Sequence, residues 1–470
     1  MFQSRSRGVE IPLTILHINN LQGHLENIPR QAYLIKKIVE ENIKNKTYTL
    51  VLGGGDIIGG TTLSTLYQGQ PAIQALNLCG YNAAVIGDRE FDYGQNNLKQ
   101  LMETANFPFL SANIVSREGE AFLAASHVVH KGPDFKIAIF GLSPPATVIS
   151  HSRDIKGLRF LDPIDTAKKL VPRLRKKAKT IILLSHLGQK ADKILAQEVH
   201  GINLILGVDS DPSLKNPFTV NNVLISSSAG SKGELIGRLN IKLKRGKIVS
   251  SSSELIPVDE KTPEDPAVSH IIKEYLGRSK ADIKKSIGQS ATAMIAAPNK
   301  IRYKETNFGD LITDIMRNEV DADLALINSA ILKGSIYPGS ITFEYIWRIL
   351  PYDSKLVIMD LTGEQIKQAL LNNINCYGKE GFLQVSGLSF KFANKSLKQI
   401  KIGEEPLDLK KLYRVALDDS LARGEFGYSV FKSGKNIFST GRSISDLLIR
   451  WIRKNKEVRA GVGERIQIVQ

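Results

Sequence analysis

The chain has 470 residues, of which 42% are hydrophobic and 23% are charged, so it is long enough for two or three domains with full hydrophobic cores. Its formal net charge is +16, which favours anionic partners such as nucleotides, nucleic acid or an anionic membrane. Only Cys79 and Cys376 are present, and two distant cysteines exclude a small disulfide-stapled fold.

The basic residues give no further sign of a nucleic-acid or membrane partner. The densest runs lie at residues 168–179 and 450–456 and are spaced like solvated helix faces, and the first run carries no interleaved aromatic residue. No stretch approaches the roughly 20 apolar residues of a membrane span. The first 18 residues have early arginines but no continuous apolar segment before a small-residue cleavage site. We therefore expect no signal peptide and a cytoplasmic location.

The first half of the chain alternates short apolar runs with amphipathic segments. We predict buried strands over residues 13–18, 49–52, 83–86, 135–140, 180–185 and 204–206, with helices over residues 30–42 and 163–177. Residues 223–243 are Ser/Gly-rich and then alternating, which favours closing antiparallel strands. Strands that alternate with helices predict layered α/β packing around one or two sheets.

Further along, the chain turns polar and Pro-containing at residues 257–265, and a helix is predicted over residues 266–285. We interpret this segment as a boundary. The predicted organisation is a first domain over residues 9–257, a linker helix within 258–285, and a second domain over 286–470 that ends in a strand at residues 466–469.

Polar clusters follow five of the predicted strands. They read NNLQGH at 19–24, GGGD at 53–56, GDRE at 87–90, SHLG at 185–188 and GVDSD at 207–211. Each cluster alone is an ordinary turn. Because ligands of open α/β sheets gather at the carboxyl ends of strands, the five clusters together predict one polar site.

These motifs resemble the bacterial 5′-nucleotidase family. Its first half follows the pattern LHTNDxHG, GGD, GNHEFDYG, SHLG and GGHxH, and this chain reads LHINNLQGH, GGGD, GDREFDYG, SHLG and GVDSD. ETNFGDLITDIMR, LPYDSKL, EGFLQVSGLSF and YRVALDDSLARGEFGY resemble its C-terminal domain. The resemblance covers nearly the whole chain. It implies a four-layer α/β/β/α calcineurin-like metallophosphoesterase domain followed by a 5′-nucleotidase C-terminal α/β domain.

The resemblance also implies seven positions that hold two metals, and most of them are changed here. Asp56, at the bridging position, and His186 are retained. Five positions differ from the family pattern: Asn20, Gln22, Asp88, Asp209 and Asp211. The remaining family histidine, which assists the leaving group or the transition-state charge, is Arg89. The set has lost three of its four imidazoles and holds four carboxylates instead of two.

This exchange disfavours a zinc-like pair of metals, because imidazole nitrogen suits zinc and other transition metals. Three outcomes stay open for four carboxylates that would otherwise repel one another. In the first, the carboxylate oxygens coordinate one hard cation, Mg²⁺ or Ca²⁺. In the second, Arg89 enters the pocket as an internal counter-ion. In the third, the loops relax apart and water solvates the acids. We weigh the two metal-free outcomes together above the cation.

In the second domain the resemblance implies a nucleoside clamp that is also eroded. The candidate substrate-binding residues are Arg302, Lys333, Tyr352, Gly381 and Phe426. Lys333 replaces a family arginine, Tyr352 retains a ring that can stack on a base, and Ser420 replaces the second stacking ring. Gly381 matches a family turn, and Phe426 stands where the family has aspartate.

Three hypotheses follow for function. The first is a pseudoenzyme of the family with a binding or scaffolding role, whose partner is a nucleotide, another anionic small molecule or a protein. The second is an active phosphoester hydrolase with a remodelled, oxygen-rich Mg/Ca-type site. The third is a basic protein that docks on nucleic acid or an acidic complex, which only net charge supports.

Overall fold

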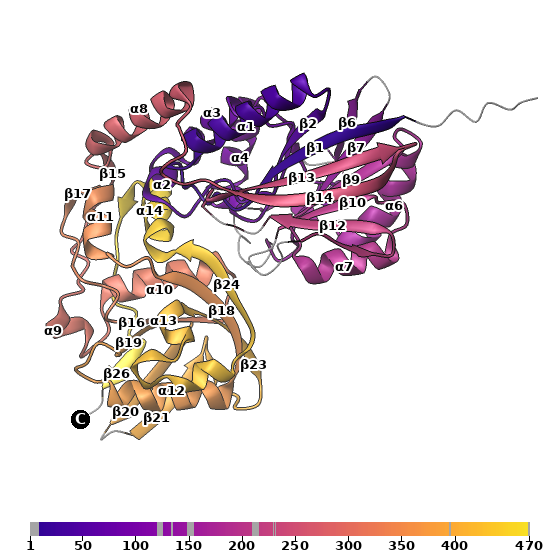
Figure 1. The fold of residues 1–470 in the computed structure, drawn as a ribbon. Coiled ribbons are helices and arrows are strands. Elements are labelled where there is room, and N and C mark those ends of the chain that lie inside the picture. Colours follow the sequence, from indigo (N-terminus) through magenta and orange to yellow (C-terminus); the bar gives the residue numbers. More distant parts are fainter. Residues whose placement is uncertain are drawn as a thin grey trace, which may run out of the picture. The chain divides into compact units, whose positions relative to one another are not determined.

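The computed structural model describes residues 9–119, 126–132, 135–147, 155–208, 216–228, 230, 232–393 and 396–468. The chain divides into two compact units. Unit 1 comprises Met1–Val148 with Asp154–Arg278, and unit 2 comprises Ile149–Arg153 with Ser279–Gln470. The two units contain the elements labelled in Figure 1. Among the described helices, none combines the length and the apolar character that crossing a bilayer requires.

Unit 1 contains two six-stranded sheets. The first has the order β14 (Lys247–Pro257), β13 (Leu235–Lys244), β1 (Glu10–Ile18), β2 (Tyr48–Gly53), β3 (Ala83–Val85) and β4 (Phe109–Leu110). The second has the order β11 (Phe218–Val220), β12 (Val223–Ser228), β10 (Leu204–Val208), β9 (Thr180–Ser185), β7 (Lys136–Leu142) and β6 (His127–Lys131). A short pair, β5 (Ile114–Ser116) and β8 (Leu158–Phe160), completes its strands.

Helices cover the outer faces of the two sheets. The helices that the structure describes in unit 1 are α1 (Ile28–Lys44), α2 (Thr62–Tyr67), α3 (Gln70–Asn77), η1 (Arg89–Phe91), α4 (Gln95–Thr104), α6 (Pro163–Arg175) and α7 (Gln189–Glu198). Helix α8 (Pro266–Asp282) crosses the boundary between the units.

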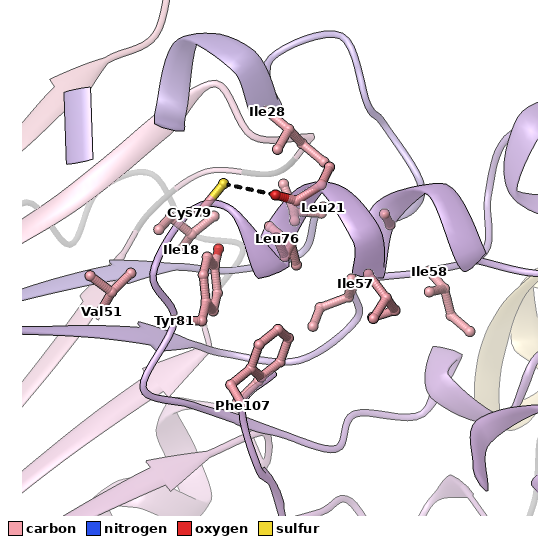
Figure 2. Close-up of a cluster of buried hydrophobic side chains, with 14 of the residues drawn as sticks. Ile18, Leu21, Ile28, Val51, Ile57, Ile58, Leu76, Cys79, Tyr81 and Phe107 are labelled. Atoms are coloured by element: carbon pink, nitrogen blue, oxygen red, sulfur yellow. Dashed lines mark hydrogen bonds between the residues drawn. The ribbon is translucent and has the colours of Figure 1, made fainter. Parts of the chain in front are cut away.

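Alternation along each strand builds the layers. On β1, Ile15 joins a buried cluster shared by both sheets, whereas its neighbour Leu16 faces the cluster beneath α1 and α3. Figure 2 shows part of this second cluster, where Leu76, Tyr81 and Phe107 pack together. A third cluster joins β7 and β9 to α6 and α7. These clusters form the helix, sheet, sheet, helix order that the resemblance implies, so the four-layer fold is confirmed.

One strand prediction is confirmed only in part. We expect residues 223–243 to form closing antiparallel strands, and β13 does so against β1. Strand β12 pairs antiparallel with β11, with Phe218 opposite Ile225, but it pairs in parallel with β10, with Ile205 opposite Ile225. The apolar run at Val223–Ile225 marks a buried strand, but hydrophobicity alone specifies neither the partner nor its direction.

Unit 2 is built on three sheets. The five-stranded sheet has the order β19 (Leu383–Ser386), β16 (Leu324–Asn328), β23 (Leu412–Asp418), β18 (Lys355–Thr362) and β24 (Lys435–Ser443). The three-stranded sheet is β17 (Gly339–Thr342), β15 (Ser286–Ser290) and β25 (Glu457–Val458). The four-stranded sheet is β22 (Glu405–Pro406), β21 (Ser396–Ile402), β20 (Leu388–Ala393) and β26 (Ile466–Ile468).

The described helices of unit 2 pack on these sheets. They are α9 (Pro298–Ile301), α10 (Asn307–Glu319), α11 (Phe343–Ile349), α12 (Gly363–Asn375), α13 (Asp419–Ala422), η2 (Glu425–Gly427), η3 (Ser429–Ser433) and α14 (Ile444–Asn455). Helix α12 begins with a capping box in which Thr362 and Gln365 satisfy each other's backbone N–H groups. Its Ile366 packs with Leu326, Val357 and Phe390 in the core.

Candidate functional site

Three of the candidate metal ligands converge at the strand ends of unit 1. Asp56 follows β2, Asp88 follows β3 and His186 directly follows β9. The Nε2 atom of His186 lies 3.4 Å from Asp56 Oδ1 and 3.7 Å from Asp88 Oδ1. One donor atom from each residue lies within 4.8 Å of the others. The loops that carry these three residues have therefore not relaxed apart.

The loop that presents Asp56 is fixed by Glu90. Asp56 has a left-handed backbone, with φ of 53°, which is uncommon outside glycine. The buried Glu90 carboxylate accepts N–H hydrogen bonds from Asp56 at 3.0 Å, Ile57 at 2.7 Å and Gly87 at 2.7 Å. Glu90 thus ties the loops after β2 and β3 together. Our sequence reasoning missed this role, and only the place of Glu90 in the GDREFDYG motif signals it.

The guanidinium of Arg89 lies inside the unit, between two carboxylates. Arg89 is only 8% exposed. Its Nε lies 4.0 Å from Asp56 Oδ2, and its Nη1 lies 3.5 Å from Asp92 Oδ2. The Arg89 backbone N–H also donates to Asp56 Oδ1 at 3.1 Å. The sequence reasoning missed Asp92, although its spacing of three from Arg89 would place both on one face of a helical turn.

The charges of this cluster shift one another's pKa values. Burial alone would raise the pKa of Asp56, but His186 and Arg89 outweigh it and lower the pKa to about 2. Burial and the neighbouring Asp56 raise the pKa of Asp88 to about 8. For His186, burial opposes the charged form, yet Asp56 and Asp88 raise its pKa to about 10. Without a cation, a charged His186 imidazole therefore lies beside an ionised Asp56, whereas Asp88 keeps its proton below about pH 8.

The donor atoms that the structure describes could hold one cation. The Nδ1 atom of His186 lies 2.6 Å from the Gly54 carbonyl, so it carries the proton when the ring is neutral, and Nε2 is left to coordinate. Asn20 Oδ1 is buried and has no hydrogen-bond partner among the described residues. Asp56, Asp88 and His186 would hold one cation, with Asn20 as a neutral fourth donor. A bound cation would polarise a phosphoryl oxygen or lower the pKa of a water.

Of the other four candidate positions, the structure describes two, Asn20 and Gln22. Asn20 and Gln22 lie next to the Asp56 loop, because their backbone N–H groups donate to Gly55 and Asp56 carbonyls at 3.2 and 2.8 Å. A neutral Gln22 amide is a weak replacement for imidazole. Asp209 and Asp211 lie outside the described residues.

In unit 2, the structure gathers the candidate clamp residues around a carboxylate that the sequence reasoning missed. Arg302 Nη2 lies 2.8 Å from Glu380 Oε1, and Lys333 Nζ lies 3.6 Å from the same oxygen. The Lys333 ammonium also lies 5.3 Å from the centre of the Tyr352 ring, which is 52% exposed. Residues 380–382 read EGF where the family turn reads GGF, so Glu380 replaces a glycine. This replacement is the signal in the sequence that could have identified Glu380.

Gly381 and Phe426 border this cluster. A Cβ at Gly381 would lie 2.7 Å from the Phe426 Cβ, so glycine is needed for the close approach. Phe426 has φ of 54° and stays 37% exposed. Ser420, which replaces the second stacking ring, instead binds the Asp418 carboxylate and accepts from Asn328 Nδ2 at 3.0 Å. Ser420 therefore belongs to an internal hydrogen-bond network.

Comparison with known proteins agrees with this architecture. Residues 286–433 match the family described as the 5′-nucleotidase C-terminal domain. The chain is 29% identical over 477 residues to YfkN of Bacillus subtilis, a trifunctional nucleotide phosphoesterase protein, covering 89% of this chain but only 32% of YfkN. It is 26% identical over 509 residues to UshA of Escherichia coli, covering 96% of this chain and 92% of UshA.

A solved structure shows the same fold over both units. The NAD nucleotidase NadN of Haemophilus influenzae is 21% identical, covers 98% of this chain and 100% of its own, and superimposes with a TM-score of 0.83. The chain is thus similar over nearly its whole length to proteins of the 5′-nucleotidase family, and residues 286–433 match that family's C-terminal domain.

Proposed function

We propose that this chain is a family member that has given up two-metal phosphoester hydrolysis and works by binding a nucleotide-like anion. The single observation that carries the proposal is the buried Arg89 guanidinium beside Asp56. A guanidinium does not give up its proton in proteins, so Arg89 cannot act as a general acid where the family has histidine. Its fixed charge also partly neutralises the carboxylate at the metal-bridging position.

The binding role rests on unit 2. Arg302 and Lys333 bring two positive charges to one point, and Tyr352 offers an exposed ring beside them. Phosphate oxygens suit the two cations, and a base can stack on the ring. Glu380 now pairs with both cations, so an incoming anion competes with this carboxylate. We therefore expect weak binding that depends on salt.

The test measures turnover and binding on the same preparation of the full chain. We expect no hydrolysis of AMP or of an aryl phosphate above the background of the Asp56→Ala variant. We also expect calorimetric binding of AMP that Lys333→Gln and Tyr352→Ala weaken and that Asp56→Ala leaves intact. Turnover that disappears in Asp56→Ala would contradict the loss of catalysis. Binding of AMP that ignores Lys333 and Tyr352 would contradict the assignment of the ligand site.

A second candidate is a phosphoester hydrolase with one Mg²⁺ or Ca²⁺ ion, favoured by the convergence of Asp56, Asp88 and His186. Oxygen ligands suit these hard cations. This candidate requires Mg²⁺- or Ca²⁺-dependent turnover that both Asp56→Ala and Asp88→Ala abolish. Activity that survives either substitution would eliminate it.

A further inference from the structure

Unit 1 has a hollow of about 650 Å³ that is lined by the ends of several elements. Its walls come from the start of β1, the start of β7, the segment after α6 and the turn between β13 and β14. The candidate metal ligands follow the carboxyl ends of β2, β3 and β9, whereas this hollow includes Thr180 at the beginning of β9. It is therefore separate from the cluster around Asp56.

The lining of this hollow is strongly basic. Its charged members are Lys136, Arg175, Lys176, Lys177, Lys179 and Arg245, and none of its described lining residues is acidic. The nearby Glu10 lies between Val9 and Ile11 on β1 and pairs with Lys242 and Lys244. Since neighbouring residues of a strand point to opposite faces, Glu10 faces away from the side that Val9 and Ile11 contribute.

Among the described residues, five of these six cations, Lys136, Arg175, Lys176, Lys177 and Lys179, show no ion pair with an acid. Arg175 donates to the Lys179 carbonyl and, at 3.3 Å, to Asn203 Oδ1, both uncharged acceptors. Lys177 Nζ lies 3.0 Å from His127 Nε2. Lys136, Lys176 and Lys179 are exposed and form no ion pair with an acid in the part of the chain that the structure describes.

The position of basic residues at the carboxyl end of α6 explains only part of the positive charge in the hollow. Cations after the last turn of α6 interact favourably with the carboxyl end of that helix. Lys136 and Arg245, however, come from β7 and from the β13–β14 turn, and they face the same hollow. One wall is apolar, with Val9, Ile11 and Phe135, and Phe135 is held edge-on against Tyr48 at 4.7 Å between ring centres.

We propose that this basic hollow binds a linear polyphosphate group, as in a nucleoside triphosphate. Cations that converge from several elements match an anion with several adjacent phosphates better than a single carboxylate. A volume of about 650 Å³ lies in the range of small-molecule sites. The apolar wall gives the ring system of the ligand a surface to pack on, so ATP binds more tightly here than inorganic tripolyphosphate does.

The experiment titrates the full chain with tripolyphosphate, ATP and adenosine by calorimetry, at low salt and with EDTA to remove divalent metals. We expect one strong site for tripolyphosphate, a tighter one for ATP that persists in Lys333→Gln/Tyr352→Ala, and no binding of adenosine in that variant. Lys136→Gln/Lys176→Gln/Lys179→Gln should weaken binding of tripolyphosphate by at least about tenfold. These lysines are exposed, so the variant should keep its melting temperature, which is measured alongside.

Two matched variants separate this site from the rest of the chain. Lys37→Gln/Lys44→Gln/Lys285→Gln removes the same charge from exposed positions elsewhere, and Lys333→Gln removes a cation from the proposed ligand site of unit 2. Both should leave the affinity for tripolyphosphate within about twofold. Equal weakening in the control triple variant, or loss in Lys333→Gln, would overturn the proposal. Binding of single-stranded DNA without binding of tripolyphosphate would also overturn it.

Discussion

Each of the two candidate sites contains a charged side chain of this chain at a place where the family pattern implies a bound metal or ligand. In unit 1 that charge is Arg89, buried beside Asp56 and Asp92. In unit 2 it is Glu380, 46% exposed at its side chain and paired with Arg302 and Lys333. A buried ion pair is needed for stability once it is present, because removing one partner leaves an uncompensated charge in the interior. An exposed pair contributes little to stability and can be displaced by a ligand.

The largest effect that tests this contrast is on stability. Arg89→Met keeps much of the side-chain volume but leaves Asp56 and Asp92 without the guanidinium, and should lower the free energy of unfolding by about 3 kcal/mol. Arg302→Met, in the exposed pair, should change it by less than about 1 kcal/mol. Urea unfolding of the two variants measures both values. Adding Asp92→Asn to Arg89→Met should recover part of the loss. Equal costs for the two arginines would break the comparison.

A smaller effect concerns a buried acid of unit 2 that lies outside both sites. Burial, and then a hydrogen bond with Glu305, raise the pKa of Asp310 to about 8, against about 3.9 for an unfolded Asp. The folded state thus holds a proton that the unfolded state releases. This contribution to stability is complete below about pH 4 and is lost as pH rises through about 8.

Asp310→Asn should remove that pH dependence. The amide keeps an oxygen for the Gly463 N–H, which Asp310 Oδ2 now accepts at 2.8 Å, and it donates to Glu305 without a titrating proton. Melting temperatures between pH 5 and pH 9 should therefore fall less steeply in the variant than in the parent chain. Parallel curves for the two proteins would show that Asp310 does not carry the proton.

The smallest effect is on binding. Glu380→Gln frees Arg302 and Lys333 from the competing carboxylate and should raise the affinity for AMP by about threefold to tenfold, with little change in stability. Glu405→Gln, which removes one exposed carboxylate from β22, is the matched control and should have no effect. Calorimetric titration measures both variants. Unchanged or weaker binding in Glu380→Gln would mean that this carboxylate does not compete with the ligand.

Sequence reasoning predicted the layers but not all of the contacts within the sites. Alternating strands and helices and the resemblance were enough for the four-layer unit 1, since each strand carries its own burial pattern. The antiparallel pairing of β12 with β11 agrees with the prediction, but its parallel pairing with β10 was missed, because an apolar run does not specify a partner. Glu90, Asp92 and Glu380 were missed for a common reason. Each acts on groups that only folding brings close to it. For Glu90 these groups are backbone N–H donors, and the amino-acid sequence does not show which N–H groups a carboxylate will meet.

The metal content of the full chain tests the central claim most directly. The chain should be incubated with excess Zn²⁺, Mn²⁺ or Mg²⁺, desalted, and examined by native mass spectrometry beside Asp56→Ala. Asp56, Asp88 and His186 offer one set of donors, with Arg89 against the bridging carboxylate. We predict at most one divalent ion per chain, lost in Asp56→Ala. Two tightly held ions per chain, both lost in Asp56→Ala, would contradict the account.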